Sequence, residues 1–339
     1  MKEKLRFDLF DKYNYVLHYI RYRKCQIAEK LTGKEHWANP NIVAGRLLMS
    51  TPKTNELIAN KILAGEPFWA GRFGGTEMNM IYQTLLYRMH PEKDGRRDAV
   101  SKLCMLSGFF PDNIELGEQF VDLMLRDCSQ IDLLAEWRRY MEDYIFVRYQ
   151  PRTKLTQLNR LEPWNLYQYP LSRVKPWSAA LKGKRVLVIH PFEDSIRRQY
   201  FENREHLFER VFEADDILPE FELITLKAVQ TLGNQPDPRF QTWFEALEWM
   251  IEECRKIEFD VAIIGCGAYG FPLAAEIKRM GKIAIHLGGA TQILFGVIGT
   301  RWETEYADFN RRVVNQYWIR PSEKERIDNA QAIESACYW

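Results

Sequence analysis

Residues 72–77, with the sequence Arg-Phe-Gly-Gly-Thr-Glu, bring a cation, two glycines and a carboxylate close together. An arginine such as Arg72 can clamp a diphosphate through paired hydrogen bonds, and glycines let the backbone approach the phosphates. A carboxylate such as Glu77 can accept a proton or hold a divalent cation that bridges phosphates. We predict that Arg72, Gly74 and Gly75 bind a phosphate-bearing ligand and that Glu77 is a catalytic and metal-binding residue. The alternative is an internal ion pair between Arg72 and Glu77 at the start of a helix.

Two glycine-rich turns in the second half of the chain are further candidates for phosphate binding. Each turn follows a strand-like segment, so that bare backbone and the unpaired N–H groups of a helix N-terminus can face a ligand. In the alternative interpretation, these glycines serve tight turns only. The expected ligand-binding residues of the two turns are Gly265, Gly267, Tyr269, Gly270, Gly288 and Gly289.

The first of these turns also matches the G-x-G-x-x-G pattern of dinucleotide-binding folds. That pattern expects an acidic residue about 20 positions further on to hold the ribose hydroxyls. His286 stands at this place instead. An NAD(P)-dependent oxidoreductase is therefore the weaker functional alternative.

Two histidines, His190 and His286, each end a strand-like segment. A titratable imidazole at a cleft can accept a proton from a substrate, so we predict both as alternative catalytic proton acceptors. In the structural alternative each is a satisfied residue of the core. The Glu193-Asp194 pair could also act as a base. In the structural alternative these acids lie at the N-terminus of a helix, where the helix dipole stabilises negative charge.

The second half of the chain must position these groups through alternating strands and helices. Strand-like runs at 185–190, 221–226, 260–265 and 282–287 alternate with helical patterns at about 194–213, 240–257 and 268–280. Near-continuous apolar strands with crossover helices predict a parallel sheet covered on both faces. Because ligands of such sheets bind beyond the carboxyl ends of the strands, the glycine turns and histidines should gather there.

The first half of the chain is predicted to be mainly helical. A helix from Thr54 ends at Gly65, a short strand spans 67–73, and Glu77 lies in the first turn of the next helix. Two or three further helices are expected within 99–142, a strand at 144–149, and a connecting loop at 151–176. The predicted units are an N-terminal helical extension (1–54), a helix-rich α/β half (55–176), a Rossmann-like parallel α/β half (177–305) and a C-terminal tail (306–339).

Composition and charge narrow the class of protein. The 339 residues carry a net charge of +1 from 47 basic and 46 acidic residues, which argues against a dedicated nucleic-acid binder. Six scattered cysteines and the absence of an apolar leader or span favour a cytoplasmic protein. Residues 1–35 hold nine Lys/Arg, five Asp/Glu and four interleaved tyrosines, so either peripheral contact with the inner face of the cell membrane or a helix packed on the body is expected.

The segment 71–77 resembles the RFG-x-x-E signature of bacterial glycosyltransferases of the D fold. The stretches that resemble a subgroup associated with surface-polysaccharide biosynthesis are 190–192, 218–223, 265–270, 286–292, 295–296, 301–302 and 337–339. This resemblance covers roughly residues 55–305, together with the ending at 337–339. It implies a D-type fold, with a Rossmann-like sheet in the C-terminal half completed by the helix-rich N-terminal half. It also implies a hexosyltransferase-type enzyme that moves a sugar from a nucleotide-sugar donor to a hydroxyl of a glycan or lipid-linked glycan.

The resemblance departs from the family at one position. Where Gly75-Thr76-Glu77 stands, the family has Asp-x-Glu, whose two carboxylates are implicated in metal and nucleotide-sugar binding. Gly75 replaces the aspartate, so a Mn²⁺ or Mg²⁺ ion on Glu77 would need Glu193, Asp194 or substrate phosphates to complete its shell. A non-catalytic nucleotide-binding or assembly module is the alternative to an active transferase. Aromatic residues of the Trp164–Trp177 segment could stack on sugar faces or fill the core.

Overall fold

The computed structural model describes residues 42–43, 46–136, 153–164, 175–333 and 336–339, together with the single positions 20, 24, 27, 31 and 149. Most of the basic N-terminal segment, of the strand expected at 144–149 and of the Trp164–Trp177 segment lies outside these residues. The predictions made for those parts of the chain therefore stay predictions.

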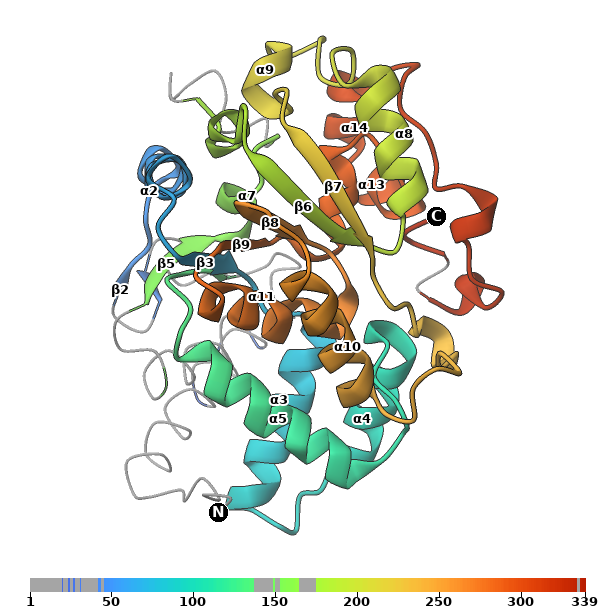
Figure 1. Ribbon diagram of the computed structural model, residues 1–339. Coiled ribbons are helices and arrows are strands. Elements are labelled where there is room, and N and C mark those ends of the chain that lie inside the picture. Colours follow the sequence, from blue (N-terminus) through green and yellow to red (C-terminus); the bar gives the residue numbers. More distant parts are fainter. Residues whose placement is uncertain are drawn as a thin grey trace.

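A seven-stranded parallel sheet forms the centre of the molecule (Figure 1), in the order β5-β4-β3-β9-β8-β6-β7. Its strands are β3 (Phe68–Gly71), β4 (Leu133–Glu136), β5 (Lys154–Gln157), β6 (Arg185–His190), β7 (Glu222–Lys227), β8 (Val261–Ile264) and β9 (Ile283–His286). The expected mixed α/β class with a parallel sheet is confirmed, and all four strands predicted in the second half are present. A separate antiparallel pair joins β1 (Ile42–Val43) to β2 (Arg46–Leu47).

The sheet does not stop at the expected boundary near residue 176. Strand β3 pairs in parallel with β9, so that Trp69 lies opposite Ala284. On its other side β3 pairs with β4, which in turn pairs with β5. Both halves of the chain thus contribute to one sheet, and residues that follow β3 share an edge with residues that follow β6, β8 and β9.

Twelve helices surround the sheet within the described ranges. They are α2 (Thr51–Ala64), α3 (Gly75–Met89), α4 (Arg96–Ser107), α5 (Ile114–Cys128), α7 (Leu158–Leu161), α8 (Glu193–Asn203), α9 (Ala214–Ile217), α10 (Trp243–Arg255), α11 (Gly270–Arg279), α12 (Thr291–Leu294), α13 (Thr300–Glu305) and α14 (Ala307–Val313). Helix α2 is closed by Gly65, as expected, but begins at Thr51 instead of Thr54. Glu77 lies in the first turn of α3, as predicted. Helix α8 is shorter than predicted, because the chain forms turns after Asn203.

Alternate residues of each strand feed two separate cores, as the period of a strand requires. Leu187 and Ile189 of β6 pack into the core covered by α3, α4, α5, α10 and α11. Val186 and Val188 face the opposite core, which includes side chains from α2 and α8. Both faces of the sheet are covered (Figure 1), which explains why its strands are near-continuous apolar runs.

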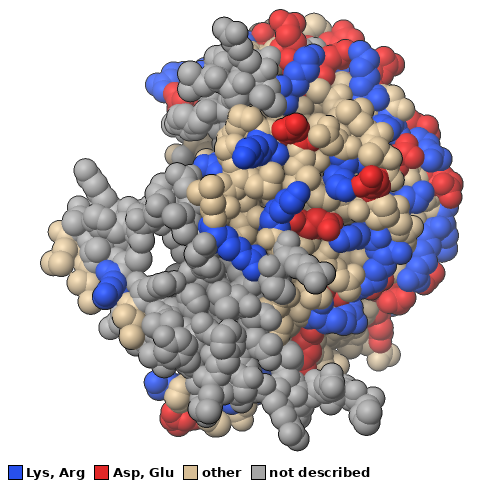
Figure 2. Space-filling view, turned by 90° about the vertical axis from the view of Figure 1, so that its left-hand side faces the viewer, with Lys and Arg blue, Asp and Glu red and all other residues tan. Residues whose placement is uncertain are grey.

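Charge on the face shown in Figure 2 is mixed: Lys/Arg and Asp/Glu side chains alternate over its described part. This agrees with the balanced composition of the chain. No helix among the described residues is long and apolar enough to cross a bilayer.

Candidate functional site

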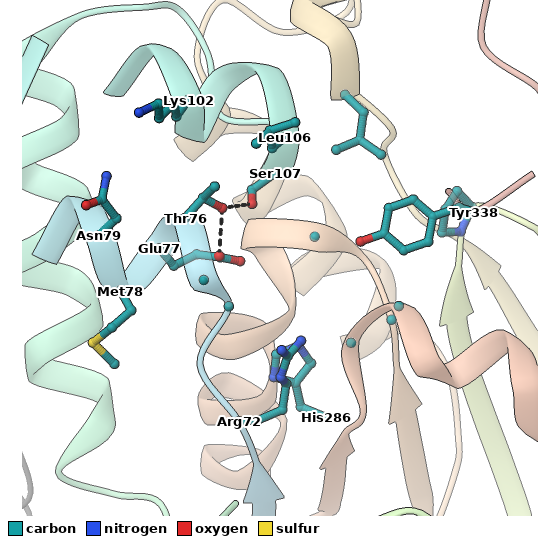
Figure 3. Close-up of a pocket in the computed structure, with 18 of the residues that line it drawn as sticks. Arg72, Thr76, Glu77, Met78, Asn79, Lys102, Leu106, Ser107, His286 and Tyr338 are labelled. Atoms are coloured by element: carbon teal, nitrogen blue, oxygen red, sulfur yellow. Dashed lines mark hydrogen bonds between the residues drawn. The ribbon is translucent and has the colours of Figure 1, made fainter. Parts of the chain in front are cut away.

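A cavity of about 560 Å³ opens at the carboxyl edge of the sheet, beside the N-terminus of α3 and the C-terminal end of α4. Figure 3 shows residues of α3 and α4 on one side of this cavity and Tyr338 on the other. Of the residues predicted from sequence, this cavity is lined by Arg72, Gly74, Gly75, Glu77, His190, Gly265, Gly267, His286, Gly288 and Gly289. The structure thus brings the 72–77 motif and both glycine turns into one pocket. Tyr269 and Gly270 do not line it.

Glu77 is delivered to the pocket by the first turn of α3 and is only 6% exposed. Its carboxylate folds back over Gly74, where a Cβ atom would lie 1.8 Å from Glu77 Oε2. The hydroxyl of Thr76 donates to the same oxygen at 3.0 Å and is also hydrogen bonded to the hydroxyl of Ser107 in α4. Glu77 is therefore held in one orientation at the pocket wall (Figure 3).

Arg72 follows directly on β3 and lies beside His286, apart from Glu77 (Figure 3). A Cβ atom at Gly288 would come within 2.8 Å of Arg72 Nη1. Gly288 also has a φ of +65°, a conformation that L side chains rarely adopt. Two independent constraints therefore require glycine here, and they place the guanidinium against the turn that follows β9.

The N-terminus of α3 has no side-chain cap, because its N-cap residue is Gly74. The first N–H groups of a helix lack intrahelical partners and carry the positive end of its dipole. Gly74, Gly75 and Thr76 at this end all line the pocket. The arrangement suits a bound anion such as a phosphate.

The N-terminus of α8, in contrast, is already occupied by a carboxylate of the chain itself. Glu325, which is buried, accepts hydrogen bonds from the backbone N–H groups of Asp194 (2.8 Å) and Ser195 (3.2 Å) and from the Ser195 hydroxyl. The side chain of Glu193 accepts a hydrogen bond from Thr225. Neither Glu193 nor Asp194 lines the pocket, so the structure gives no support to either as the base or as a completing metal ligand.

His190 and His286 both reach the pocket, but burial lowers the pKa of each to about 3. The positive charge of Arg72 adds to this shift of the pKa at His286. Nδ1 of His190 accepts a hydrogen bond from the backbone N–H of Phe192 at 3.0 Å, so the proton of the neutral ring sits on Nε2. Both imidazoles are thus weak bases, and His190 offers a donor, which counts against the predicted role of these histidines as proton acceptors.

The glycines of the 265–270 turn are explained by packing within the protein. A Cβ atom added at Gly265 would lie 2.5 Å from the carbonyl oxygen of Gly288. One added at Gly267 would lie 2.7 Å from the carbonyl oxygen of Ser107, and one added at Gly270 would lie 2.4 Å from Nε2 of His286. The Tyr269 ring stacks on Trp243 at 5.0 Å within the core. The predicted ligand-binding roles of Tyr269 and Gly270 are not supported, and the G-x-G-x-x-G match no longer argues for a dinucleotide.

A divalent cation does not fit the side chains of the pocket. No group of three or more His, Cys, Asp or Glu residues that could hold a metal occurs in the described ranges. Glu77 is the one acidic side chain among the described lining residues, and three cations, Arg72, Lys102 and Arg301, line the same cavity. The charge of the pocket therefore favours an anionic ligand over a metal ion.

Sequence reasoning did not single out Lys102, Ser107, Arg301 or Tyr338 as site residues, although all four line the pocket. Lys102 and Ser107 come from α4, whose sequence shows no feature that separates them from other helical residues. Tyr338 lies far from the glycine turn in sequence, yet a Cβ atom at Gly289 would lie 2.4 Å from its Cε1 atom.

Comparison with known proteins found no family model that matches the chain and no matching curated protein. Two solved structures resemble it. One is a selenomethionine-substituted structure of domain of unknown function 1792, with 12% identity and a TM-score of 0.45, covering 87% of this chain and 91% of the other. The second, described as "The highly conserved domain of unknown function 1792 has a distinct glycosyltransferase fold", has 11% identity and a TM-score of 0.45, covering 86% of this chain and 90% of the other. At these TM-scores the likeness does not carry an assignment of function, which is argued below from the pocket.

Proposed function

We propose that this protein is a glycosyltransferase that moves a sugar from a nucleotide-sugar donor to a hydroxyl group of a glycan. The observation that carries the proposal is the shared pocket: an uncapped helix N-terminus, a guanidinium against a glycine turn and one buried carboxylate all face it. The resemblance of the 72–77 motif to D-fold glycosyltransferases supports the same reaction. A nucleotide sugar offers the diphosphate, the sugar and the leaving group that such a pocket can serve.

The diphosphate is assigned to Arg72, the N-terminus of α3 and the Gly288–Gly289 turn. A guanidinium makes paired, charge-assisted hydrogen bonds to phosphate oxygens, and the α3 N–H groups add the helix dipole. These groups are fixed before the substrate arrives, since β3 and β9 lie side by side in the sheet. Such preorganised donors stabilise the negative charge that develops on a departing diphosphate.

Glu77 is assigned as the base for the acceptor hydroxyl. The acceptor oxygen forms a bond to the anomeric carbon while the bond from that carbon to the diphosphate oxygen breaks, and the hydroxyl proton passes to the Glu77 carboxylate. The leaving diphosphate keeps the electron pair. His190 acts as a hydrogen-bond donor through Nε2–H instead of as a base.

The proposal extends to the acceptor and its location. The resemblance to a surface-polysaccharide subgroup supports a growing or lipid-linked glycan as the acceptor, which a cytoplasmic enzyme would meet at the inner face of the membrane. Ile20, Ile27 and Leu31 are exposed and spaced as one face of a helix, which supports peripheral contact with a membrane surface.

The test is release of nucleoside diphosphate from a panel of nucleotide sugars by the wild-type protein, Glu77→Gln and Glu115→Gln. Glu115 is the matched control, because it is an exposed glutamate in the first turn of α5, a helix of the same 15-residue length as α3. We expect release by wild type and Glu115→Gln, and a loss of about 100-fold or more in Glu77→Gln. Binding of nucleoside diphosphate without release by any variant would favour a non-catalytic nucleotide-binding module. Equal release by wild type and Glu77→Gln would remove Glu77 from the mechanism.

A further inference from the structure

Tyr338 forms a wall of the pocket across from Glu77 (Figure 3), and the proposed mechanism gives this residue no role. Its ring lies against Gly289, where a Cβ atom would come within 2.4 Å of Tyr338 Cε1. Cζ of Arg301 lies 5.0 Å from the centroid of the same ring. In Figure 3 the hydroxyl of Tyr338 points across the pocket toward the side formed by α3 and α4.

The backbone around Tyr338 is held firmly in place. Gln292 Nε2 donates a hydrogen bond to the Tyr338 carbonyl oxygen at 3.2 Å, and the backbone N–H of Arg301 donates to the Cys337 carbonyl oxygen at 3.1 Å. The indole N–H of Trp339 donates to the Glu325 carbonyl oxygen at 3.1 Å, and its ring packs edge-on against Phe192. The ring of Tyr338 is therefore presented to the pocket in a fixed position, at low entropic cost to a ligand that stacks on it.

The phosphate-binding residues and the tyrosine ring are direct neighbours. Gly288 lies against the guanidinium of Arg72, and the next residue, Gly289, lies against the ring of Tyr338. Consecutive Cα atoms are about 3.8 Å apart. Figure 3 places Glu77 and Tyr338 on opposite sides of the pocket, so a phosphate held by Arg72 would lie between the two.

A nucleotide sugar is a linear molecule, with the sugar and the nucleoside at opposite ends of the diphosphate. If Glu77 faces the reacting sugar, the nucleoside must extend in the other direction. We propose, building on the function proposed above, that Tyr338 is the nucleoside-binding residue of this pocket and that its ring stacks on the base of the donor. Every nucleobase has a flat face that an aromatic side chain can cover, and Arg301 supports the tyrosine ring from the side of α13.

The test compares ligands that share the diphosphate but differ in the nucleoside. Binding of uridine, guanosine, cytidine and adenosine diphosphates and of inorganic pyrophosphate to the full chain is measured by titration calorimetry. The variants are Tyr338→Phe, which keeps the ring, and Tyr338→Leu, which keeps apolar contact with Gly289 but removes the ring. Tyr306→Leu is the control, since Tyr306 is exposed and does not line the pocket.

We expect Tyr338→Leu to weaken binding of the preferred nucleoside diphosphate by roughly ten-fold or more and to leave pyrophosphate binding unchanged. Tyr338→Phe and Tyr306→Leu should bind both ligands as wild type does. Retained pyrophosphate binding also shows that the pocket of Tyr338→Leu is intact. The inference is overturned if Tyr338→Leu binds the nucleoside diphosphate as tightly as wild type, or if it loses both ligands equally. Failure of the wild-type protein to bind any of these ligands would instead refute the proposed function.

Discussion

The carboxylate of Glu77 lies directly over the backbone of Gly74, and a Cβ atom at position 74 would fall 1.8 Å from Glu77 Oε2. The backbone of Gly74 itself is extended, with φ −81° and ψ 157°, which any residue can adopt. Glycine is therefore required at position 74 by the side chain of Glu77 and not by backbone strain. A substitution at position 74 therefore tests whether the position of the Glu77 carboxylate matters for function.

Gly74→Ala should displace the Glu77 carboxylate while α3 stays folded. Since small misplacements of a reacting group can cost about 100-fold in rate, we expect cleavage of the nucleotide-sugar donor to fall by roughly that factor. The free energy of unfolding should change by less than about 1 kcal/mol. Gly65→Ala is the control: nothing lies within 4 Å of its Cβ position and its φ is +67°, so it should lose stability and keep activity. Full activity of Gly74→Ala would contradict the role given to Glu77.

The second prediction concerns metal dependence. Because Glu77 is the one acidic residue among the described lining residues, binding of nucleoside diphosphate to wild type should be the same with Mn²⁺ and with EDTA. Gly75→Asp restores a second carboxylate two positions before Glu77, at the first residue of α3, where an acid is favoured. In this variant Mn²⁺ should strengthen binding of the nucleotide, and calorimetry measures both effects. Loss of nucleotide binding by wild type in EDTA would show that the protein relies on a divalent cation.

The third prediction concerns the carboxylate that caps α8. Glu325→Ala would leave the N–H groups of Asp194 and Ser195, and the hydroxyl of the buried Ser195, without their acceptor. We expect the free energy of unfolding to drop by about 2 to 4 kcal/mol. The exposed neighbour Glu323, changed to Gln, should alter stability by less than about 0.5 kcal/mol. Denaturant unfolding compares the two variants, and an equal effect of both would rule out the capping role.

The fourth prediction follows from the buried histidines. Burial lowers the pKa of His190 and of His286 from 6.5 to about 3. Between pH 6.5 and 3 the unfolded chain therefore binds more protons at these sites than the folded chain, and stability falls as the pH falls. At pH 5 each histidine should lower the free energy of unfolding by roughly 2 kcal/mol relative to neutral pH.

Urea unfolding at pH 7 and pH 5 measures this loss of stability. Burial raises the pKa of Glu162 to about 7, so this carboxyl also titrates between the two pH values, but it does so in wild type and variants alike. His286→Asn should lose less stability than wild type between the two pH values, whereas the exposed control His90→Gln should show the wild-type slope. Identical slopes for wild type and His286→Asn would mean that His286 is not held neutral in the folded protein.

Much of the sheet could be predicted from the sequence, because strands covered on both faces are apolar throughout. The run Arg185–His190 is an example, and the structure places β6 over these same residues. Two strands that the first half contributes to this sheet were not predicted, and neither was the separate pair β1–β2, which lies in the region expected to be a helical extension. Leu133–Glu136 lies in a region that the sequence predicts to be helical, because its four apolar or helix-favouring residues carry no strand signal. Lys154–Gln157 is a short edge strand inside a segment expected to be a loop. Its alternation of polar and apolar residues extends over too few positions to be recognised in the sequence.

The meeting of the 72–77 motif with the glycine turns could be expected, since parallel strands end at one edge. The contacts between individual groups of the site could not be predicted. The contacts of Gly288 with Arg72 and of Gly289 with Tyr338 depend on the pairing of β3 with β9 and on the path of residues 336–339. No periodicity encodes that path. The protonation state of the two histidines could not be predicted either. The residue type suggests proton transfer, but burial lowers the pKa of His190 and of His286 and makes them weak bases.

A crystal structure with a bound nucleoside diphosphate tests the central claim most directly. The account predicts the phosphates between the N-terminus of α3, Arg72 and the Gly288–Gly289 turn, with the nucleoside on the Tyr338 side and Glu77 facing the terminal phosphate. Phosphates bound elsewhere, for example in the smaller cavity lined by Arg320 and Arg326, would contradict it.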